Sequence, residues 1–416
     1  MLSQKNGRPI RALAFLLALL SPFLAGIAGL LMVPPARAAE PKLDGESYLI
    51  PSADPGVQLY IRNKHPAGVT SFTPDKILLY VHGATYPAET SFDLPLGGRS
   101  MMDCVAQHGY DVYLIDVRGY GGSTKPLEMD APPADNKPIV DTPTAARDVG
   151  AAVDHILQKR GVGKIDLIGW SWGTAIMGLY TTTHNDKVNR LVLYAPAWTF
   201  TTRPAIGGGE TPLGAYRTVS KDSAKQRWLN GVPDAKKADL IPDGWFEQWA
   251  DATWALDAAG AKQTPPVLRA PNGVLQDFRT YWIAGKPQYD PADIRVPTLL
   301  IHAEWDADLP SDQARGYFAK ADQRALQALH RNRGRHALDH DGKEPHAVLP
   351  RDHEFPGRAR PAEHELGRGL INAQPRPHRS ESNHAYATPQ QHLALPIFPS
   401  NRTWLRKGGI DGNNDP

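Results

Sequence analysis

Short apolar runs alternate with segments of helical periodicity from Ser47 to about Leu309, and this alternation restricts the folds open to the chain. Each run ends at glycine or a turn residue, as strands buried on both faces of a parallel sheet do. The runs span residues 76–82, 111–116, 164–169, 190–194 and 297–302, and helical spacing is found at residues 98–107 and 142–159. The pattern predicts an α/β fold, a mainly parallel sheet with helices on both faces.

One stretch interrupts the alternation. Between Pro196 and about Arg295 no clear strand is evident, and short helix-like pieces such as residues 244–259 carry Trp, Tyr and charged residues instead. An insertion between two core strands has this appearance. We therefore expect a core at residues 39–320, with a helical cap inserted at about residues 198–293.

The segment Gly169-Trp170-Ser171-Trp172-Gly173 carries the strongest chemical signal. An apolar run, residues 165–168, precedes it, and a helix-like run follows it. A strand, a sharp turn and a helix in this order present one hydroxyl at the carboxyl edge of a sheet, and glycines around the serine avoid side-chain collisions. A serine hydroxyl needs a base before it becomes a good nucleophile. Ser171 is therefore the candidate nucleophile.

Attack by a serine creates an oxyanion, which backbone N–H groups can stabilise. One donor is expected from Trp172, directly after the serine at the start of the helix. The other is expected from the loop after the first apolar run, His82-Gly83-Ala84, with the N–H of Ala84 as the candidate. His82 itself is interpreted as a structural histidine at the strand end rather than as a base.

Four pieces of the chain together resemble the α/β-hydrolase superfamily, in the branch that carries a helical cap. They are the His82-Gly83 loop, the turn Asp116–Ser123, the turn around Ser171 and the strand end Leu299–Pro310. The resemblance covers about residues 47–320 and implies the α/β-hydrolase fold and acyl transfer to water. A serine at the turn argues against haloalkane dehalogenase or epoxide hydrolase chemistry, which in this superfamily needs a carboxylate at that position.

The resemblance also implies the acid and the order of the catalytic groups. In this family the acid falls in a D-x-x-x-P pattern after the strand, which selects Asp306 with Pro310, and Asp308 is the alternative. The acid orients a histidine and stabilises its charged form. The order serine, acid, histidine places the base downstream of Asp306.

The chain after Lys320 departs from this pattern. A last strand and a histidine loop are expected, but no strand is evident, and residues 321–416 are rich in His, Arg and Pro, which is typical of a disordered tail. Read one nucleotide later, the segment can encode a strand, a histidine loop and a closing helix in order. We therefore hypothesise a frameshift. In the frame as written His336 is the candidate base, because it lies beside the codon where the expected histidine falls.

The first 38 residues have the layout of a secretory signal peptide. Basic residues precede an apolar run at about residues 12–33, and Ala36-Arg37-Ala38 forms a small-residue cleavage site. The alternative is an uncleaved membrane anchor, because the run is long enough to span a bilayer. We expect cleavage after Ala38 and a secreted or periplasmic protein without stable membrane association.

Composition excludes several classes of function. The chain has 46 Lys and Arg against 44 Asp and Glu, a net charge of +2, so nothing indicates a nucleic-acid partner. We find no metal-ligand cluster and no phosphate-binding glycine loop, so no cofactor is expected and the predicted partner is a small-molecule substrate. Cys104 is the single cysteine, which excludes an intramolecular disulfide.

The function that these features predict is hydrolysis of an ester-type carbonyl through an acyl-enzyme on Ser171, impaired if the base is missing. The first alternative is an aminopeptidase of the proline-iminopeptidase kind, which would need an acidic cap residue to hold the substrate amine. The second is a catalytically dead homologue of the hydrolases.

Overall fold

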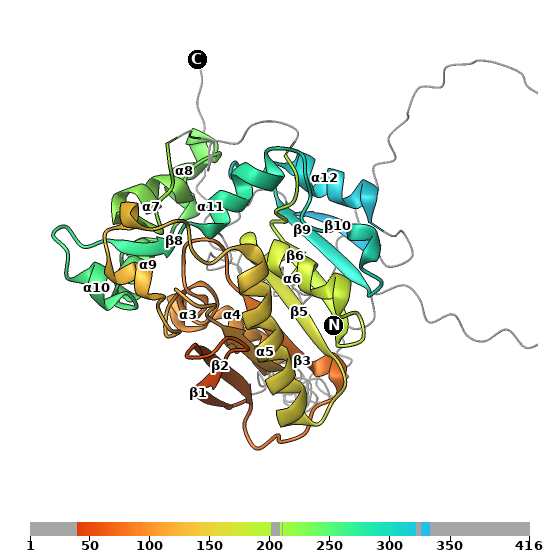
Figure 1. Cartoon of the computed structure of the whole chain (residues 1–416). Coiled ribbons are helices and arrows are strands. Elements are labelled where there is room, and N and C mark those ends of the chain that lie inside the picture. The colour runs from red at the N-terminus through yellow and green to blue at the C-terminus, as the bar shows by residue number, and fades with distance from the viewer. Residues whose placement is uncertain (1–39, 201–208, 210, 322–325, 333–416) are drawn as a thin grey trace, which may run out of the picture. The chain divides into compact units, whose positions relative to one another are not determined.

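The computed structural model describes residues 40–200, 209, 211–321 and 326–332 (Figure 1). The chain divides into a unit that ends at Lys42 and one that begins at Leu43, and the sheet and the candidate site belong to the second. The predicted signal segment 1–38 lies outside the described residues, and so does the tail after Asn332, including His336. Within the described ranges, no helix combines the length and the apolar character that a membrane span requires.

An eight-stranded sheet forms the core, in the order β1-β2-β4-β3-β5-β6-β9-β10. The first three strands in this order pair antiparallel, and all later neighbours pair parallel. All residues of β3, β4 and β5 are buried, as the apolar runs predict. The strands are β1 (Leu43–Pro51), β2 (Gln58–Pro66), β3 (Ile77–Val81), β4 (Asp111–Ile115), β5 (Ile165–Trp170), β6 (Val188–Tyr194), β9 (Thr298–Ala303) and β10 (Leu326–Asn332).

Helices connect the parallel strands and cover both faces of the sheet. The chain passes from β3 through α4 to β4 on one side, and then from β4 through α5 to β5 on the other side of β3. Because such crossovers are right-handed, the reversal puts α4 and α5 on opposite faces, and α6 joins α5. The core helices are α3 (Ala88–Phe92), α4 (Met101–Gln107), α5 (Thr142–Arg160), α6 (Trp172–Thr183) and α12 (Ser311–Lys320).

Local signals in the sequence fix the ends of these helices. Ser100 and Asp103 form a capping box at the start of α4. The side chain of Asp141 accepts the N–H of Thr144 at the start of α5, and Gly161 ends α5 in the left-handed conformation, with φ of 64°. The predicted helices therefore form close to the expected residues. Short 3₁₀ helices lie at Pro74–Lys76, Leu96–Gly98, Leu127–Asp130, Pro133–Asp135 and Pro291–Asp293.

The predicted cap is present between β6 and β9, and it contains a sheet that the sequence did not indicate. Two strands pair antiparallel, with Tyr216 opposite Pro271 and Val219 opposite Leu268. The expectation of no strand there is therefore wrong, because these strands are too short and too rich in charged residues to read as apolar runs. The cap elements are β7 (Tyr216–Val219), α7 (Lys221–Trp228), α8 (Asp234–Leu240), α9 (Trp245–Ala255), α10 (Ala258–Ala261), β8 (Leu268–Pro271), α11 (Gly273–Asp277) and a π-helical turn (Phe278–Trp282).

A second expectation is also wrong at the far edge of the sheet. Residues 326–332 of the frame as written form β10, parallel to β9, with Leu329 opposite Leu300. The sequence showed no strand there because the segment lacks an apolar run. The antiparallel hairpin β1–β2 at the opposite edge was not predicted either, since β1 is mostly exposed and β2 alternates buried with less buried residues, so neither forms an apolar run.

Candidate active site

The strand order reverses at β3, which lies between β4 and β5. In such sheets ligands bind in the crevice outside the carboxyl ends of the strands at the point of reversal. The loop that begins at His82 leaves β3 at this point, and Ser171 leaves β5 beside it. The topology therefore brings the serine and the candidate oxyanion loop to one place.

Ser171 occupies a turn whose backbone is strained. Its φ is 54° and its ψ is −120°, a conformation that side-chain-bearing residues rarely adopt. A Cβ added at Gly169 would lie 2.3 Å from the carbonyl oxygen of Gly173, and one at Gly173 would lie 2.5 Å from that of Val81. Both glycines are required because backbone occupies the space that a side chain would need.

Hydrogen bonds hold this turn in place. The N–H of Ser171 donates to the carbonyl of Tyr194 on β6 at 2.9 Å. The hydroxyl of Thr174 donates to the carbonyl of Ser171 at 2.6 Å and accepts the N–H of Ala197 at 2.8 Å. Trp172 is the first residue of α6, so its N–H has no partner within the helix and points out at the helix N-terminus.

His82 orients the peptide that carries the candidate oxyanion donor. Its Nε2 accepts the N–H of Val117 at 3.2 Å, so Nδ1 carries the hydrogen and donates to the carbonyl of Gly83 at 2.7 Å. The Gly83–Ala84 peptide is trans, and its N–H therefore points away from His82. Burial lowers the pKa of His82 and keeps the ring neutral. His82 is a structural histidine, as the sequence predicted.

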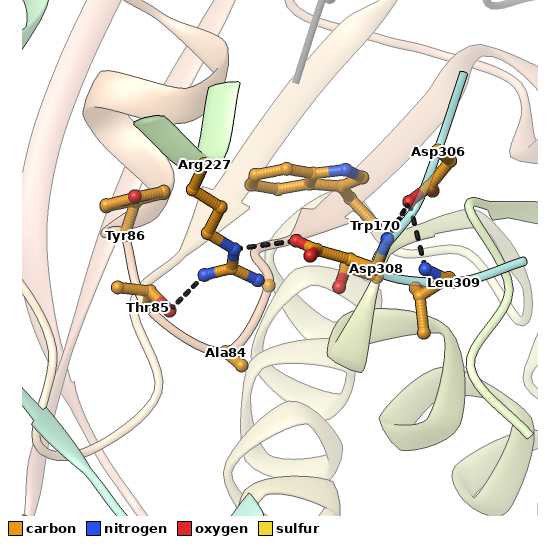
Figure 2. A pocket seen from close by; sticks show the side chains of 10 residues that line it. Ala84, Thr85, Tyr86, Trp170, Arg227, Asp306, Asp308 and Leu309 are labelled. Atoms are coloured by element: carbon orange, nitrogen blue, oxygen red, sulfur yellow. Dashed lines mark hydrogen bonds and ion pairs between the residues drawn. The ribbon is translucent and has the colours of Figure 1, made fainter. Parts of the chain in front are cut away.

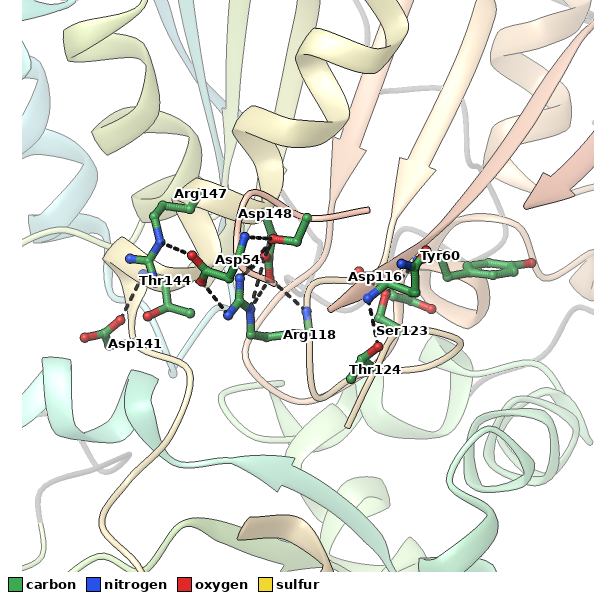
Figure 3. Close-up of polar contacts among 12 residues, drawn as sticks. Asp54, Tyr60, Asp116, Arg118, Ser123, Thr124, Asp141, Thr144, Arg147 and Asp148 are labelled. Carbon is green, nitrogen blue, oxygen red and sulfur yellow. Dashed lines mark hydrogen bonds and ion pairs between the residues drawn. The ribbon is translucent and has the colours of Figure 1, made fainter. Parts of the chain in front are cut away.

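The turn Asp116–Ser123 after β4 is held by its own polar network (Figure 3). Arg118 forms an ion pair with Asp148 of α5, with Nη2 and Oδ1 2.5 Å apart, and a second one with Asp54. The hydroxyl of Ser123 donates to the carbonyl of Asp116 at 2.5 Å. This network fixes the position of Tyr120, which lies inside the turn.

Two groups fix the loop after β3 through the carbonyl of Ala84. The hydroxyl of Tyr120 donates to this carbonyl at 2.8 Å, and Nη2 of Arg217 on β7 donates to it at 2.7 Å. A Cβ at Gly83 would lie 3.2 Å from the Cβ of Ser171, so the loop packs directly on the serine turn. The core and the cap thus position the Ala84 segment together.

Asp306 lies buried just after β9, and the described residues hydrogen-bond to only one of its carboxylate oxygens (Figure 2). Oδ1 accepts the N–H groups of Asp308 at 3.0 Å and Leu309 at 2.9 Å. Oδ2 has no hydrogen-bond partner among the described residues. Burial, followed by the neighbouring Asp308 carboxylate, raises the pKa of Asp306 to about 7. Such a carboxylate gains stability from a cationic partner at Oδ2.

Asp308, the alternative acid, is engaged elsewhere. Nε of Arg227 on α7 donates to its Oδ2 at 2.6 Å, and Nη1 of the same arginine donates to the hydroxyl of Thr85 at 3.1 Å (Figure 2). The Asp308 carboxylate pairs with the cap, whereas Asp306 faces the interior. The geometry favours Asp306 over Asp308 as the acid.

Two adjoining cavities contain the serine. The first is lined by residues 83–86, Trp170, Ser171, Arg227, Asp306, Asp308 and Leu309. The second has a volume of about 200 Å³ and adds Trp172, Arg217, Leu275 and Phe278 to part of that lining. The structure therefore brings together Ser171, Ala84, Trp172 and Asp306, four of the five predicted site residues. His336, the fifth, lies outside the described residues.

The sequence did not indicate Thr85, Arg217 or Arg227 as site residues. Both arginines come from the cap, where no periodicity or motif distinguishes one charged residue from another. Only the fold of β7 and α7 directs them to the serine.

Comparisons with known proteins agree with this architecture. Residues 76–330, from the start of β3 into β10, match the family model described as alpha/beta hydrolase fold. A Schizosaccharomyces pombe protein named as a probable lipase is 35% identical over 92 residues, 21% of this chain and 20% of the relative. Human lipase member K is 23% identical over 149 residues, 36% of this chain and 37% of the relative. The chain thus spans well under half of these relatives.

Solved structures to which the chain is similar include the following two. One is a serine hydrolase involved in carbazole degradation, 16% identical with a TM-score of 0.48 over 72% of this chain and 93% of that one. Another is 2-hydroxy-6-oxo-6-phenylhexa-2,4-dienoate hydrolase from Rhodococcus sp. strain RHA1, which is 12% identical with a TM-score of 0.48. The match covers 73% of this chain and 95% of that one. The family model spans well over half of the chain, and this protein belongs to the α/β-hydrolase fold family.

Proposed function

We propose that this protein is a serine hydrolase that cleaves carboxylic esters through an acyl-enzyme on Ser171. The observation that carries the proposal is the strained turn of Ser171, which shares its cavity with the buried carboxylate of Asp306. Strain of this kind persists where the surrounding structure enforces it, and it gathers at functional sites. The two lipases among the relatives add support at the level of reaction class.

In the first half of the reaction, the Ser171 hydroxyl attacks the ester carbonyl and its proton passes to a histidine. The carboxylate of Asp306 orients that histidine through Oδ2 and stabilises the imidazolium. The N–H groups of Ala84 and Trp172 stabilise the oxyanion. Collapse of the tetrahedral intermediate breaks the ester bond, and the alcohol leaves with the proton from the imidazolium.

In the second half, water attacks the acyl-enzyme and gives its proton to the same histidine. The acid product leaves, and the proton returns to Ser171. In the chain as written, we propose His336 as this base. If the frame is shifted, the histidine of the shifted frame takes this role instead. Sequencing the gene around the codon for Lys320 tests the frame, and an early stop in the shifted frame would refute the frameshift.

The lining of the cavities favours an ester over a peptide with a free amino end. An aminopeptidase needs a cap carboxylate to hold the substrate amine. Among the described residues, the cap contributes Arg217, Arg227, Leu275 and Phe278 to the two cavities, and no carboxylate. Arg217, which has no carboxylate partner among the described residues, repels a protonated amine at this place.

A fluorophosphonate probe and p-nitrophenyl butyrate test the proposal on the full chain. We expect Ser171 to be labelled, and ester hydrolysis and labelling to be lost in Ser171→Ala. Ser223→Ala, an exposed serine on the cap helix α7, is the matched control and should retain both. Labelling that survives in Ser171→Ala would place the nucleophile elsewhere. Hydrolysis of aminoacyl-arylamides but not of esters would favour the aminopeptidase.

We also propose export of the protein with removal of residues 1–38. The basic start, the apolar run and Ala36-Arg37-Ala38 in the sequence support this. Mass spectrometry of the protein from a periplasmic fraction tests it. A mature protein that begins at Ala39 is expected, and an intact N-terminus in the membrane fraction would favour the anchor.

A further inference from the structure

The larger cavity beside Ser171 has a cationic wall built by two cap arginines. Arg217 comes from β7 and Arg227 from α7, and both line the 200 Å³ cavity. The two guanidinium groups meet at the buried hydroxyl of Thr85, which accepts Nη2 of Arg217 at 2.9 Å and Nη1 of Arg227 at 3.1 Å. A wall of this kind is costly to build, because like charges repel and burial removes their water.

Arg217 has no carboxylate partner among the described residues. Its Nη1 donates to the carbonyl of Pro271 at 2.7 Å and contacts Ala270 and Asn272, and its Nη2 donates to Ala84 and Thr85. All these acceptors are neutral oxygens, so the positive charge is solvated by dipoles but not neutralised. Burial, followed by repulsion from Arg227, lowers the pKa of Arg217.

The groups that remain available on Thr85 and Arg227 are hydrogen-bond donors, beside the Asp308 carboxylate in the same lining. The Thr85 oxygen accepts two arginine N–H groups, which leaves its own hydrogen free to donate. Arg227 uses Nε for Asp308 and Nη1 for Thr85, and a guanidinium has five N–H donors, so it has further hydrogens to donate. A ligand at this wall must therefore bring acceptors.

The charges do not balance at this wall. Asp308 neutralises Arg227, and Arg217 leaves an excess of one positive charge in the lining of the cavity. We propose that the cavity binds an anionic group of the substrate, so that the enzyme prefers esters whose acyl or alcohol part carries a carboxylate. Arg217 supplies the charge, and Thr85 and Arg227 supply the hydrogen bonds.

The apolar part of the lining fits the rest of such a substrate. Trp172, Leu275 and Phe278 line the same cavity with apolar surface. A short hydrocarbon chain between the ester carbonyl at Ser171 and the carboxylate at Thr85 contacts this surface. The preferred ligand is therefore amphipathic, with an ester at one end and an anion at the other.

This inference rests on the proposed function for the identity of the reacting end, but binding tests it without turnover. The full chain with Ser171→Ala is titrated calorimetrically with monomethyl glutarate and with dimethyl glutarate, a matched pair that differs in one charge. We expect the anionic ester to bind at least 10-fold more tightly at low salt, with a preference that shrinks as NaCl is raised. Equal affinities would overturn the inference.

Two further variants separate charge from structure. Arg217→Met should abolish the preference, and Arg217→Lys, which retains the charge, should keep most of it. A merely structural role for Arg217 would weaken both esters equally in both variants and would also overturn the inference. In the Ser171-containing chain, mono-p-nitrophenyl glutarate should be cleaved with a higher kcat/KM than p-nitrophenyl butyrate. An anion preference in binding without fluorophosphonate labelling would refute the esterase and leave the anion site standing.

Discussion

Gly169 and Gly173 lie in such close contact that a methyl group on the first would reach to 2.3 Å from the carbonyl oxygen of the second. Since the contact is with backbone, no side-chain rotation can relieve it. We expect Gly169→Ala to destabilise the protein by on the order of 3 kcal/mol, because the turn around Ser171 must shift. Urea denaturation followed by tryptophan fluorescence measures the change.

Gly163→Ala is the control for this substitution. Gly163 is exposed in the turn before the same strand, and a Cβ there would meet nothing within 4 Å. Its effect should stay within about 1 kcal/mol of the wild type. Equal effects of the two substitutions would contradict the packing argument.

The stability of the fold should depend on pH through Asp306. Its pKa of about 7 lies above the value of an exposed carboxyl, so the folded protein binds this proton more tightly than the unfolded chain. Below the pKa that the carboxyl has in the unfolded chain, it is protonated in both states and does not lower the free energy of unfolding. As the pH rises from there to about 7, the free energy of unfolding falls, because the buried group resists ionisation. Stability from this group is thus lost with rising pH.

Asp306→Asn removes the ionisation and should remove this loss. We expect the variant to gain stability over the wild type between pH 5 and pH 8, by on the order of 1–4 kcal/mol. Thermal melts at the two pH values measure the gain, with the exposed Asp293→Asn as control. A difference between variant and wild type that does not change with pH would show that Asp306 is ionised throughout.

The ion pair between Arg227 and Asp308 should stabilise the contact of the cap helix α7 with the core segment after β9. A double-mutant cycle with Arg227→Met and Asp308→Asn is expected to give a coupling energy of about 1–2 kcal/mol, because the Asp308 side chain is only 12% exposed. Lys225 of the same helix pairs with Glu247 of α9, and these side chains are 49% and 58% exposed. A cycle there should give less than about 0.5 kcal/mol. Coupling of equal size in both cycles would argue against a special role for the first pair.

His82 should affect catalysis through the Gly83–Ala84 peptide rather than through proton transfer. We expect His82→Gln to lower kcat by about 10–100-fold with little change in KM, because the Ala84 N–H loses its fixed direction. The pH profile of kcat/KM should keep its shape, since the ring of His82 is neutral in the fold. A changed profile would instead make His82 a titrating participant.

His108→Gln is the matched control for His82→Gln. His108 also contacts a backbone carbonyl, that of Cys104 at 2.7 Å, but it is exposed and lies away from the cavity residues. The variant should retain full kcat. Circular dichroism and melting temperature of both variants show whether they remain folded.

The parallel core could be predicted from the sequence because strands that are buried on both faces consist of continuous apolar residues. Residues 77–81, 111–115 and 165–170 form strands within a residue or two of their expected limits. The turn around Ser171 could be predicted for a second reason, since its backbone contacts tolerate only glycine on both sides. Both constraints act on neighbouring residues, so a single sequence is enough to recognise them.

The remaining elements depend on partners that are distant in the chain. Strands β7 and β8 pair across the four helices α7 to α10, and β10 gains its place from β9 rather than from its own pattern. The contact of Arg217 with the Ala84 carbonyl joins residues 133 positions apart. Such relationships arise from tertiary packing, which no periodicity records, so the cationic wall could not be foreseen.

Thr85 connects the cap to the loop that carries the proposed oxyanion donor. Its hydroxyl receives an N–H from β7 and another from α7, and Arg217 holds Ala84 with the same guanidinium. Displacement of β7 or of α7 from the core would therefore break a hydrogen bond to Thr85. Displacement of β7 would also remove Arg217 from the carbonyl of Ala84. The position of the cap and the orientation of the Ala84 peptide are thus coupled through one hydroxyl and one guanidinium group.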